Sequence, residues 1–162
     1  MDLREDHAAK EQAAWQAFLA VVESVPPDRR EDQTVVPGWS VKDLIWHNAS
    51  WTTFAVTELA KLAGDPFKNP FNEHDDAHWD RLSEAFIDEG RTRTFNEVLT
   101  DSERSRENAR ATWLSLDDMD EQRAAWVAEE THIHYAEHMK EIQQWRTRAK
   151  GAAGPAGGQH LD

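Results

Sequence analysis

Apolar side chains recur every three or four positions along most of the chain, which is the period of a helix buried on one side. The first such stretch runs from about Leu3 to Glu23 and stops before the prolines at 26 and 27, which cannot continue a helix. A second stretch runs to about Leu62. Its buried side is predicted to carry Leu44, His47, Trp51, Phe54 and Glu58. The pattern thus places a histidine in a core position.

Capping residues mark where the predicted helices begin. Ser40 precedes the second helix and Asp43 follows three residues later. The Ser40 side chain can accept a hydrogen bond from the exposed amides there, and the Asp43 carboxylate favours the positive end of the helix. Thr94 and Glu97 form the same arrangement, a capping box, ahead of a later helix. These signals predict helix starts near residues 41 and 95.

The rest of the pattern predicts a helical region that begins near His78, restarts after Thr94 and continues to Leu116, and a last helix from about Ala128 to Arg148. Residues 67–77 are expected to connect helices across one end of the molecule. Residues 101–110 contain few large apolar side chains, which predicts a solvated face supported by charge pairs. No strand-like alternation is present. We therefore predict an all-α fold, an up-down four-helix bundle over residues 1–150, with a disordered tail over 151–162.

The composition narrows the classes of partner. Asp and Glu number 31 against 18 Lys and Arg, a net charge of -13, which disfavours nucleic acid and membrane surfaces as partners. The chain contains no cysteine, so a thiol in its chemistry would have to come from a substrate or cofactor. The charged N-terminus and the lack of a long apolar run favour a cytoplasmic location.

Two histidine pairs share a four-residue spacing, which stacks both rings on one face of a helix. His134 and His138 lie on the apolar face of the last predicted helix. His74 and His78 instead lie in an acidic connection with no apolar stripe behind them, so we interpret them as solvated or capping residues. His132 is off the apolar face and is expected to lie outside any site.

The first pair and His47 suggest a three-histidine metal site. A bundle can hold a metal ion between two ligands on one helix and a third on a facing helix, with other coordination positions left open. Spacing alone leaves a second interpretation open, because buried histidines are often satisfied by hydrogen bonds. The helices themselves do not decide between these two readings.

Carboxylates near the pair are candidates for a supporting or catalytic role. Glu130, Glu137 and Glu141 lie within one turn of His134 or His138, and a carboxylate can accept the N–H of the ring nitrogen that faces away from a metal. Glu141 could itself be a ligand. Candidates to shape a substrate pocket are Asn48, Trp51, Phe67 and Phe71.

Two segments carry a resemblance to a known superfamily. Residues 37–47, with the sequence PGWSVKDLIWH, and residues 131–146, with THIHYAEHMKEIQQWR, resemble the second and last helices of DinB/YfiT-like proteins. The last helix is most similar to the branch of ClbS/DfsB-type self-resistance proteins. The resemblance implies an up-down four-helix bundle and a divalent metal, often nickel or zinc, whose ligands correspond to His47, His134 and His138.

The resemblance leaves several functions open, because members of the superfamily differ in activity. Among them, the similarity to the ClbS/DfsB-type branch favours a metal-dependent enzyme that acts on a reactive small molecule by hydrolysis or ring opening, in detoxification or self-resistance. The alternatives are a transferase that uses a low-molecular-weight bacterial thiol, and a protein that sequesters a metabolite or metal without turnover. The thiol-dependent maleylpyruvate isomerase branch usually has glutamate where this chain has His134, which disfavours isomerisation. Helix bundles often pair through an outer helix face, so a homodimer is a further expectation.

Overall fold

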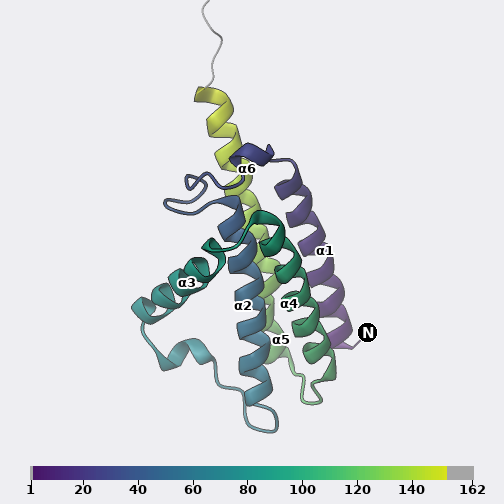
Figure 1. Cartoon of the computed structure of the whole chain (residues 1–162). Coiled ribbons are helices and arrows are strands. Elements are labelled where there is room, and N and C mark those ends of the chain that lie inside the picture. Colours follow the sequence, from purple (N-terminus) through teal and green to yellow (C-terminus); the bar gives the residue numbers. More distant parts are fainter. Residues whose placement is uncertain (1, 153–162) are drawn as a thin grey trace, which may run out of the picture.

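The computed structural model describes residues 2–152, and the regular elements in that range are helices (Figure 1). The α-helices are α1 (Leu3–Glu23), α2 (Val41–Lys61), α3 (Asp76–Arg91), α4 (Phe95–Ser115), α5 (Glu121–Ala128) and α6 (His134–Ala152). Short 3₁₀ turns lie at Pro27–Arg29 and Pro70–Glu73. One turn of π-helix, Glu129–Ile133, joins α5 to α6. The all-α prediction is confirmed.

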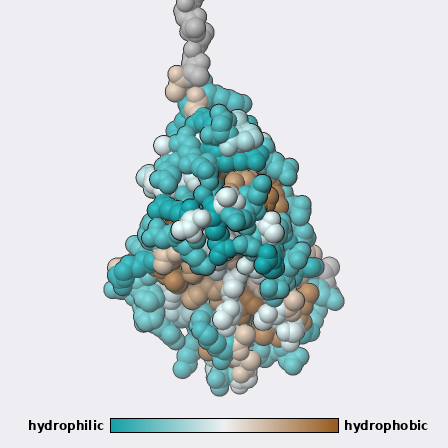
Figure 2. Space-filling model, viewed as in Figure 1, coloured by the Kyte–Doolittle hydropathy of each residue, from teal (hydrophilic) through white to brown (hydrophobic). Residues whose placement is uncertain are grey.

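The predicted tail falls largely outside the described part of the chain. Residues 151 and 152 form the end of α6, and residues 153–162 lie outside the described residues. Within residues 2–152, no helix is both long enough and apolar enough to cross a lipid bilayer. The visible surface is mostly hydrophilic, with apolar side chains exposed in the angle between α3 and α2 (Figure 2).

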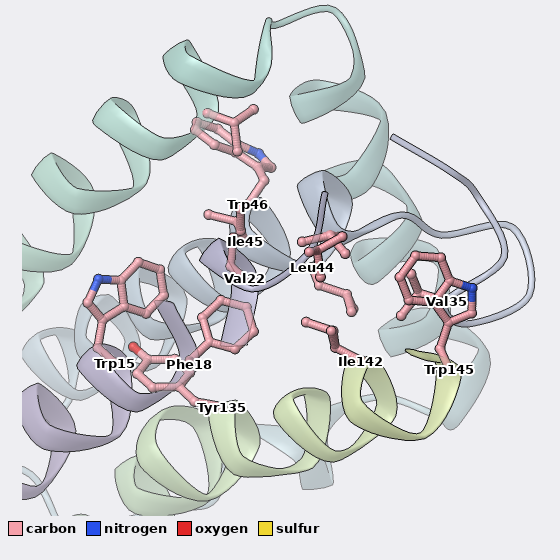
Figure 3. Close-up of a cluster of buried hydrophobic side chains, with 13 residues drawn as sticks. Trp15, Phe18, Val22, Val35, Leu44, Ile45, Trp46, Tyr135, Ile142 and Trp145 are labelled. Atoms are coloured by element: carbon pink, nitrogen blue, oxygen red, sulfur yellow. The ribbon is translucent and has the colours of Figure 1, made fainter. Parts of the chain in front are cut away.

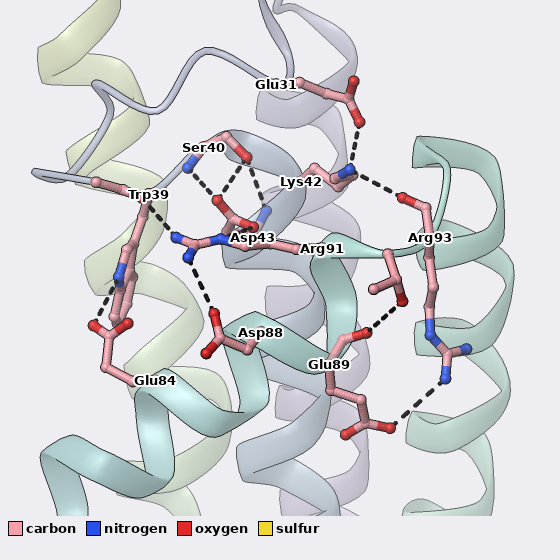
Figure 4. Close-up of polar contacts among 12 residues, drawn as sticks. Glu31, Trp39, Ser40, Lys42, Asp43, Glu84, Asp88, Glu89, Arg91 and Arg93 are labelled. Carbon is pink, nitrogen blue, oxygen red and sulfur yellow. Dashed lines mark hydrogen bonds and ion pairs between the residues drawn. The ribbon is translucent and has the colours of Figure 1, made fainter.

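The predicted caps are present at the starts of α2 and α4. The Asp43 amide donates to the Ser40 hydroxyl at 3.2 Å, and the Asp43 carboxylate accepts from the Ser40 amide at 2.8 Å (Figure 4). Thr94 and Glu97 repeat this exchange at 3.3 and 2.8 Å. Each exchange satisfies amides that have no partner inside the helix, which is why both helices begin where the sequence predicts.

Side chains from α1, α2 and α6 form the main core (Figure 3). Its fully buried members include Trp15, Phe18, Leu44, Ile45, Tyr135 and Ile142. A second cluster lies towards the other end of α2 and includes Ala55, Val56, Leu59, Trp113, Trp126 and Val127. Both clusters contain side chains of α2. This helix therefore lies at the centre of the packing and carries His47 into it.

Helix α3 leans away from the other helices and is fixed mainly near its C-terminal end (Figure 1). Its buried residues are Ile87 and Gly90. A Cβ atom at Gly90 would lie 2.8 Å from Cγ of Trp46, so this close approach requires glycine. Arg91 donates to the Gly38 carbonyl at 2.8 Å (Figure 4). The first half of α3 consequently forms a wall beside α2.

The last helical segment does not begin near Ala128 as predicted, because α5 and the π turn come before α6. The helical segment begins at Glu121, where the Asp120 side chain accepts from the Arg123 amide at 2.8 Å. Trp126 and Val127 then bury against the second core cluster. The helical segment therefore starts earlier than predicted, because Asp120 caps it.

The predicted solvated face over residues 101–110 is wrong at two positions. Ser102 and Arg106 are buried. The Arg106 guanidinium donates to the Glu11 carboxylate of α1 at 2.7 Å, and Glu11 is buried as well. Some of the charged residues of α4 therefore face the core, because an ion pair between α4 and α1 takes the place of apolar side chains there.

A buried histidine, His7, packs where α1 meets α4 and the π turn. Its ring centroid lies 4.4 Å from that of Trp113, and its Nε2 lies 3.4 Å from the Thr131 hydroxyl. Burial, followed by the nearby charge of His132, lowers the pKa of His7 to about 4. The neutral ring is therefore the form that the fold accommodates.

We expect His7 to make the metal-free protein sensitive to acid. Between pH 6.5 and about 4 the unfolded chain binds a proton that the folded chain does not, so the free energy of unfolding falls as the pH drops. The His7 contribution to this loss is at most about 3 kcal/mol. In urea titrations between pH 7 and 4.5, His7→Gln should show a shallower loss than wild type. The exposed His74→Gln control should keep the wild-type slope, and equal slopes for all three proteins would contradict the assignment.

Candidate metal centre

Two helices bring the three predicted histidines together. His47 lies in α2, His134 begins α6, and His138 follows one turn later. The Nε2 atom of His134 lies 3.2 Å from Nε2 of His47 and 2.9 Å from Nε2 of His138. A metal ion can be held where the ligand atoms of three or more His, Cys, Asp or Glu side chains lie close together. Within the described residues, these three histidines form such a group.

The spacing of the nitrogens fits a metal bound on one side. Metal–nitrogen bonds of about 2.0–2.1 Å, at angles of about 90–109°, separate neighbouring nitrogens by about 2.8–3.4 Å. Both short Nε2 distances fall in this range. All three candidate ligand atoms lie within 4.8 Å of one another. The group could therefore hold one ion without moving either helix.

The protonation states also suit metal binding. Burial, and then the charges of His138 and His134, hold the pKa of His47 well below its usual value. Burial, and then His138, lower the pKa of His134 to about 3. Both rings are thus neutral at pH 7. Neutral imidazole is the form that ligates a metal.

Glu141 fixes the orientation of one ring. Its carboxylate lies 2.5 Å from Nδ1 of His138, so Nδ1 donates to Glu141 and Nε2 faces the other histidines. The Nδ1 atoms of His47 and His134 are buried and have no protein partner within residues 2–152. The structure thus places Glu141 behind a candidate ligand and not among the ligands.

The π turn immediately before His134 sets the direction of the site. Over Glu129–Ile133 the backbone widens to the π-helical repeat, which rotates the residues that follow relative to a continuous α-helix. The turn is held on its buried side by the Thr131 hydroxyl, which donates to the Val127 carbonyl at 2.7 Å. Such turns inside helices occur often at functional sites.

A pocket of about 390 Å³ opens beside two of the histidines. Its walls come from α2, α3, the π turn, the start of α6 and the connection before α3. They are formed by His47, His134, Trp51, Phe71, Trp79, Asp76, Ser83 and Glu130. The position of α3 beside α2 creates this space, so residues far apart in the sequence share one cavity.

Glu130 is the predicted carboxylate that reaches the pocket. Burial, and then the charges of Glu129 and Glu137, raise its pKa to about 7. A carboxyl group with such a pKa can both accept and donate a proton near neutral pH. Glu137 itself is exposed and is not part of the pocket lining.

The predicted pocket residues divide into two groups. Trp51 and Phe71 line the pocket. Asn48 is fully buried away from the lining, and its side-chain amide has no protein partner in the described residues. Phe67 packs near Trp126, with ring centroids 6.3 Å apart.

Sequence reasoning missed several residues that border the site. Asp76, Trp79 and Ser83 line the pocket from α3, and the ring centroid of Trp39 lies 4.9 Å from that of His47. The spacing of three and four between the α3 residues was a detectable signal for a shared face. Nothing in the sequence indicated that this face meets the histidines.

The second histidine pair forms no comparable group. The rings of His74 and His78 stack with centroids 3.9 Å apart, before and within the first turn of α3. His74 is exposed. This placement agrees with the interpretation of the pair as surface residues.

A larger groove of about 610 Å³ lies on the other side of α3, between α2 and α4. Trp46, Phe54 and Phe86 contribute its apolar surface. None of the three clustered histidines lines this groove, and its charged residues include the Arg93–Asp101 ion pair. We therefore place the candidate site in the smaller pocket, where the groups capable of chemistry converge.

A protein of known structure has a fold similar to that of this chain. A crystal structure of an uncharacterised protein from Escherichia coli UTI89 aligns with a TM-score of 0.70 and 14% sequence identity, over 91% of this chain and 94% of that chain. No curated protein matches the sequence. Residues 12–139, which include all three histidines, match the mycothiol maleylpyruvate isomerase N-terminal domain family. With most of its length matched, the chain belongs to this family, which is part of the DinB/YfiT-like helical superfamily.

Proposed function

We propose that the protein is a metal-dependent transferase that joins a low-molecular-weight thiol to a reactive small molecule. The observation that carries this proposal is the convergence of three histidines beside an open pocket. The chain has no cysteine, so a thiol nucleophile must come from outside. When bound, a divalent metal such as nickel or zinc would lower the pKa of that nucleophile.

Each residue of the site has a proposed task. His47, His134 and His138 hold the metal, and Glu141 keeps the proton of His138 on Nδ1. Glu130 is placed to take up the proton that the nucleophile loses, because it lines the pocket beside His134. The surrounding helices are proposed to form the up-down four-helix bundle of the superfamily, with α3 as an addition that closes the pocket.

The choice between thiol and water rests on family membership. The family description links its members to mycothiol, a low-molecular-weight thiol, which supports transfer and a cytoplasmic location where such thiols stay reduced. The resemblance of the last helix to ClbS/DfsB-type proteins supports hydrolysis or ring opening as the second candidate. Glu130 suits both reactions, since water and thiols each give up a proton on attack.

A product analysis distinguishes these functions. Zinc- or nickel-loaded protein is mixed with 1-chloro-2,4-dinitrobenzene, with or without mycothiol, and the products are identified by mass spectrometry. We expect thioether formation with loss of chloride, at least about a hundredfold above the uncatalysed rate. In this step the sulfur–carbon bond forms, the carbon–chlorine bond breaks and the thiol proton passes to a base.

The other outcomes assign the protein differently. Dinitrophenol formed equally well without a thiol would indicate hydrolysis and overturn the transferase proposal. Tight binding of the electrophile with no product would indicate sequestration. Glu130→Gln should slow thioether formation about 10²- to 10⁴-fold, whereas the exposed Glu137→Gln should leave the rate nearly unchanged.

A further inference from the structure

Among the described residues, no side chain with a permanent positive charge lines the pocket beside the histidines. Asp76 and Glu130 contribute carboxylates, and no Lys or Arg of the described residues lines the pocket. Sites that bind carboxylate or phosphate groups usually present arginine or lysine to them. The carboxylates of the lining therefore repel an anionic substrate, and no Lys or Arg of the lining compensates by forming an ion pair with it.

Carboxylates around the site would partly offset the charge of a bound metal ion. A divalent ion adds two positive charges. Asp76 and Glu130 oppose these charges at the pocket, and Glu141 opposes them at the hydrogen bond to His138. These carboxylates would therefore weaken the attraction of the loaded site for a dianion.

Aromatic rings form the wall that faces the histidines. The centroid of Phe71 lies 4.8 Å from that of Trp79 and 5.9 Å from that of Trp51. Trp51 and Trp79 lie 6.4 Å apart. The rings meet edge-on or tilted, and together they give the pocket an apolar wall that can contact the body of a bound molecule. Ser83 adds a neutral hydroxyl to the same wall.

We infer that this pocket selects an uncharged electrophile with an apolar, aromatic-sized body and discriminates against molecules that carry carboxylates. The inference rests on the proposed function in that it treats the pocket as the substrate site. It sets this chain apart from the substrate in the family description, because maleylpyruvate carries two carboxylates.

Three probes with one skeleton test the preference directly. The binding of 2-naphthalenemethanol, 2-naphthylmethylamine and 2-naphthoate to zinc-loaded protein is measured by equilibrium dialysis at pH 8. We expect the alcohol to bind at least about tenfold more tightly than the carboxylate, and the amine to bind at least as tightly as the alcohol.

Matched variants locate the effect. Asp76→Asn combined with Glu130→Gln should raise the affinity for 2-naphthoate at least about fivefold and change that for the alcohol by less than about twofold. Asp80→Asn, an exposed position of α3 outside the lining, should change neither. Phe71→Ala should weaken binding of the alcohol, because it removes one aromatic wall.

The outcomes separate this inference from the proposed function. Equal or tighter binding of 2-naphthoate, no response to the double variant, or no binding of any probe would each overturn the inference. Because these probes do not react, their binding is independent of turnover. The expected affinities with no thioether product would retain the charge preference and reject the transferase. Thioether formation together with preferred binding of 2-naphthoate would retain the transferase and reject the charge preference.

Discussion

Replacement of His134 by alanine is expected to lower the affinity for zinc or nickel by at least about a thousandfold. His134 lies between the other two candidate ligands, with its Nε2 at 3.2 and 2.9 Å from theirs, so its removal would leave the site incomplete. Loss of a group that only supports a metal ligand typically costs about 10- to 100-fold, and loss of a ligand should cost more. Competition with a chromophoric chelator measures the affinity.

Two further variants calibrate this result. Glu141→Gln keeps the shape of the side chain but weakens the hydrogen bond to His138, and should lower metal affinity by about 10- to 100-fold. His74→Ala, which alters the surface pair, should have no effect. If His134→Ala binds metal as tightly as wild type, or if His74→Ala weakens binding equally, the three-histidine assignment is wrong.

The Arg106→Met variant is expected to be less stable than wild type by about 3–5 kcal/mol, because it leaves a buried carboxylate without its partner. Arg106 is 2% exposed and Glu11 is 3% exposed. Glu11 also accepts a hydrogen bond from the Tyr135 hydroxyl at 3.0 Å, and that hydroxyl lies 2.5 Å from the Thr52 hydroxyl. This network ties α1, α2, α4 and α6 together. Urea titration at pH 7 measures the loss.

A double variant tests whether the cost arises from the unpaired charge. Glu11→Gln combined with Arg106→Met removes both charges and keeps an acceptor for Tyr135, so it should recover much of the lost stability. As a control, Lys10→Met removes an exposed residue that pairs with Asp6 at 2.7 Å, and it should lower the free energy of unfolding by less than about 1 kcal/mol. A double variant as unstable as the sum of its single changes would reject this explanation.

Local signals in the sequence predicted much of the fold. The three- and four-residue spacing and the caps at Ser40 and Thr94 located α1, α2 and α4, because they depend on residues within one or two turns. The start of α5 was missed because Asp120 stands in a run of acidic residues in which several could serve as a cap. The π turn was also missed, since the apolar pattern of Glu129–Ile133 is compatible with an ordinary α-helix.

Contacts between distant segments were harder to predict. His47, His134 and His138 could be grouped because each lies on the apolar face of its own helix. Arg106 could not be placed in the core, because a charged residue on an amphipathic helix usually faces water, and its partner Glu11 is 95 residues away. The contribution of Trp79 to the pocket depends on the angle of α3, which is set by the fit of Gly90 against another helix.

The most direct test of the metal site is the metal content of the wild-type protein. The protein is purified without a histidine tag, incubated with zinc or nickel, dialysed extensively and analysed by mass spectrometry of the elements. The account predicts about one metal ion per chain, retained through dialysis at pH 7.5 and released on acidification. Less than about a tenth of an equivalent of either metal, under conditions in which the protein remains folded, would contradict it.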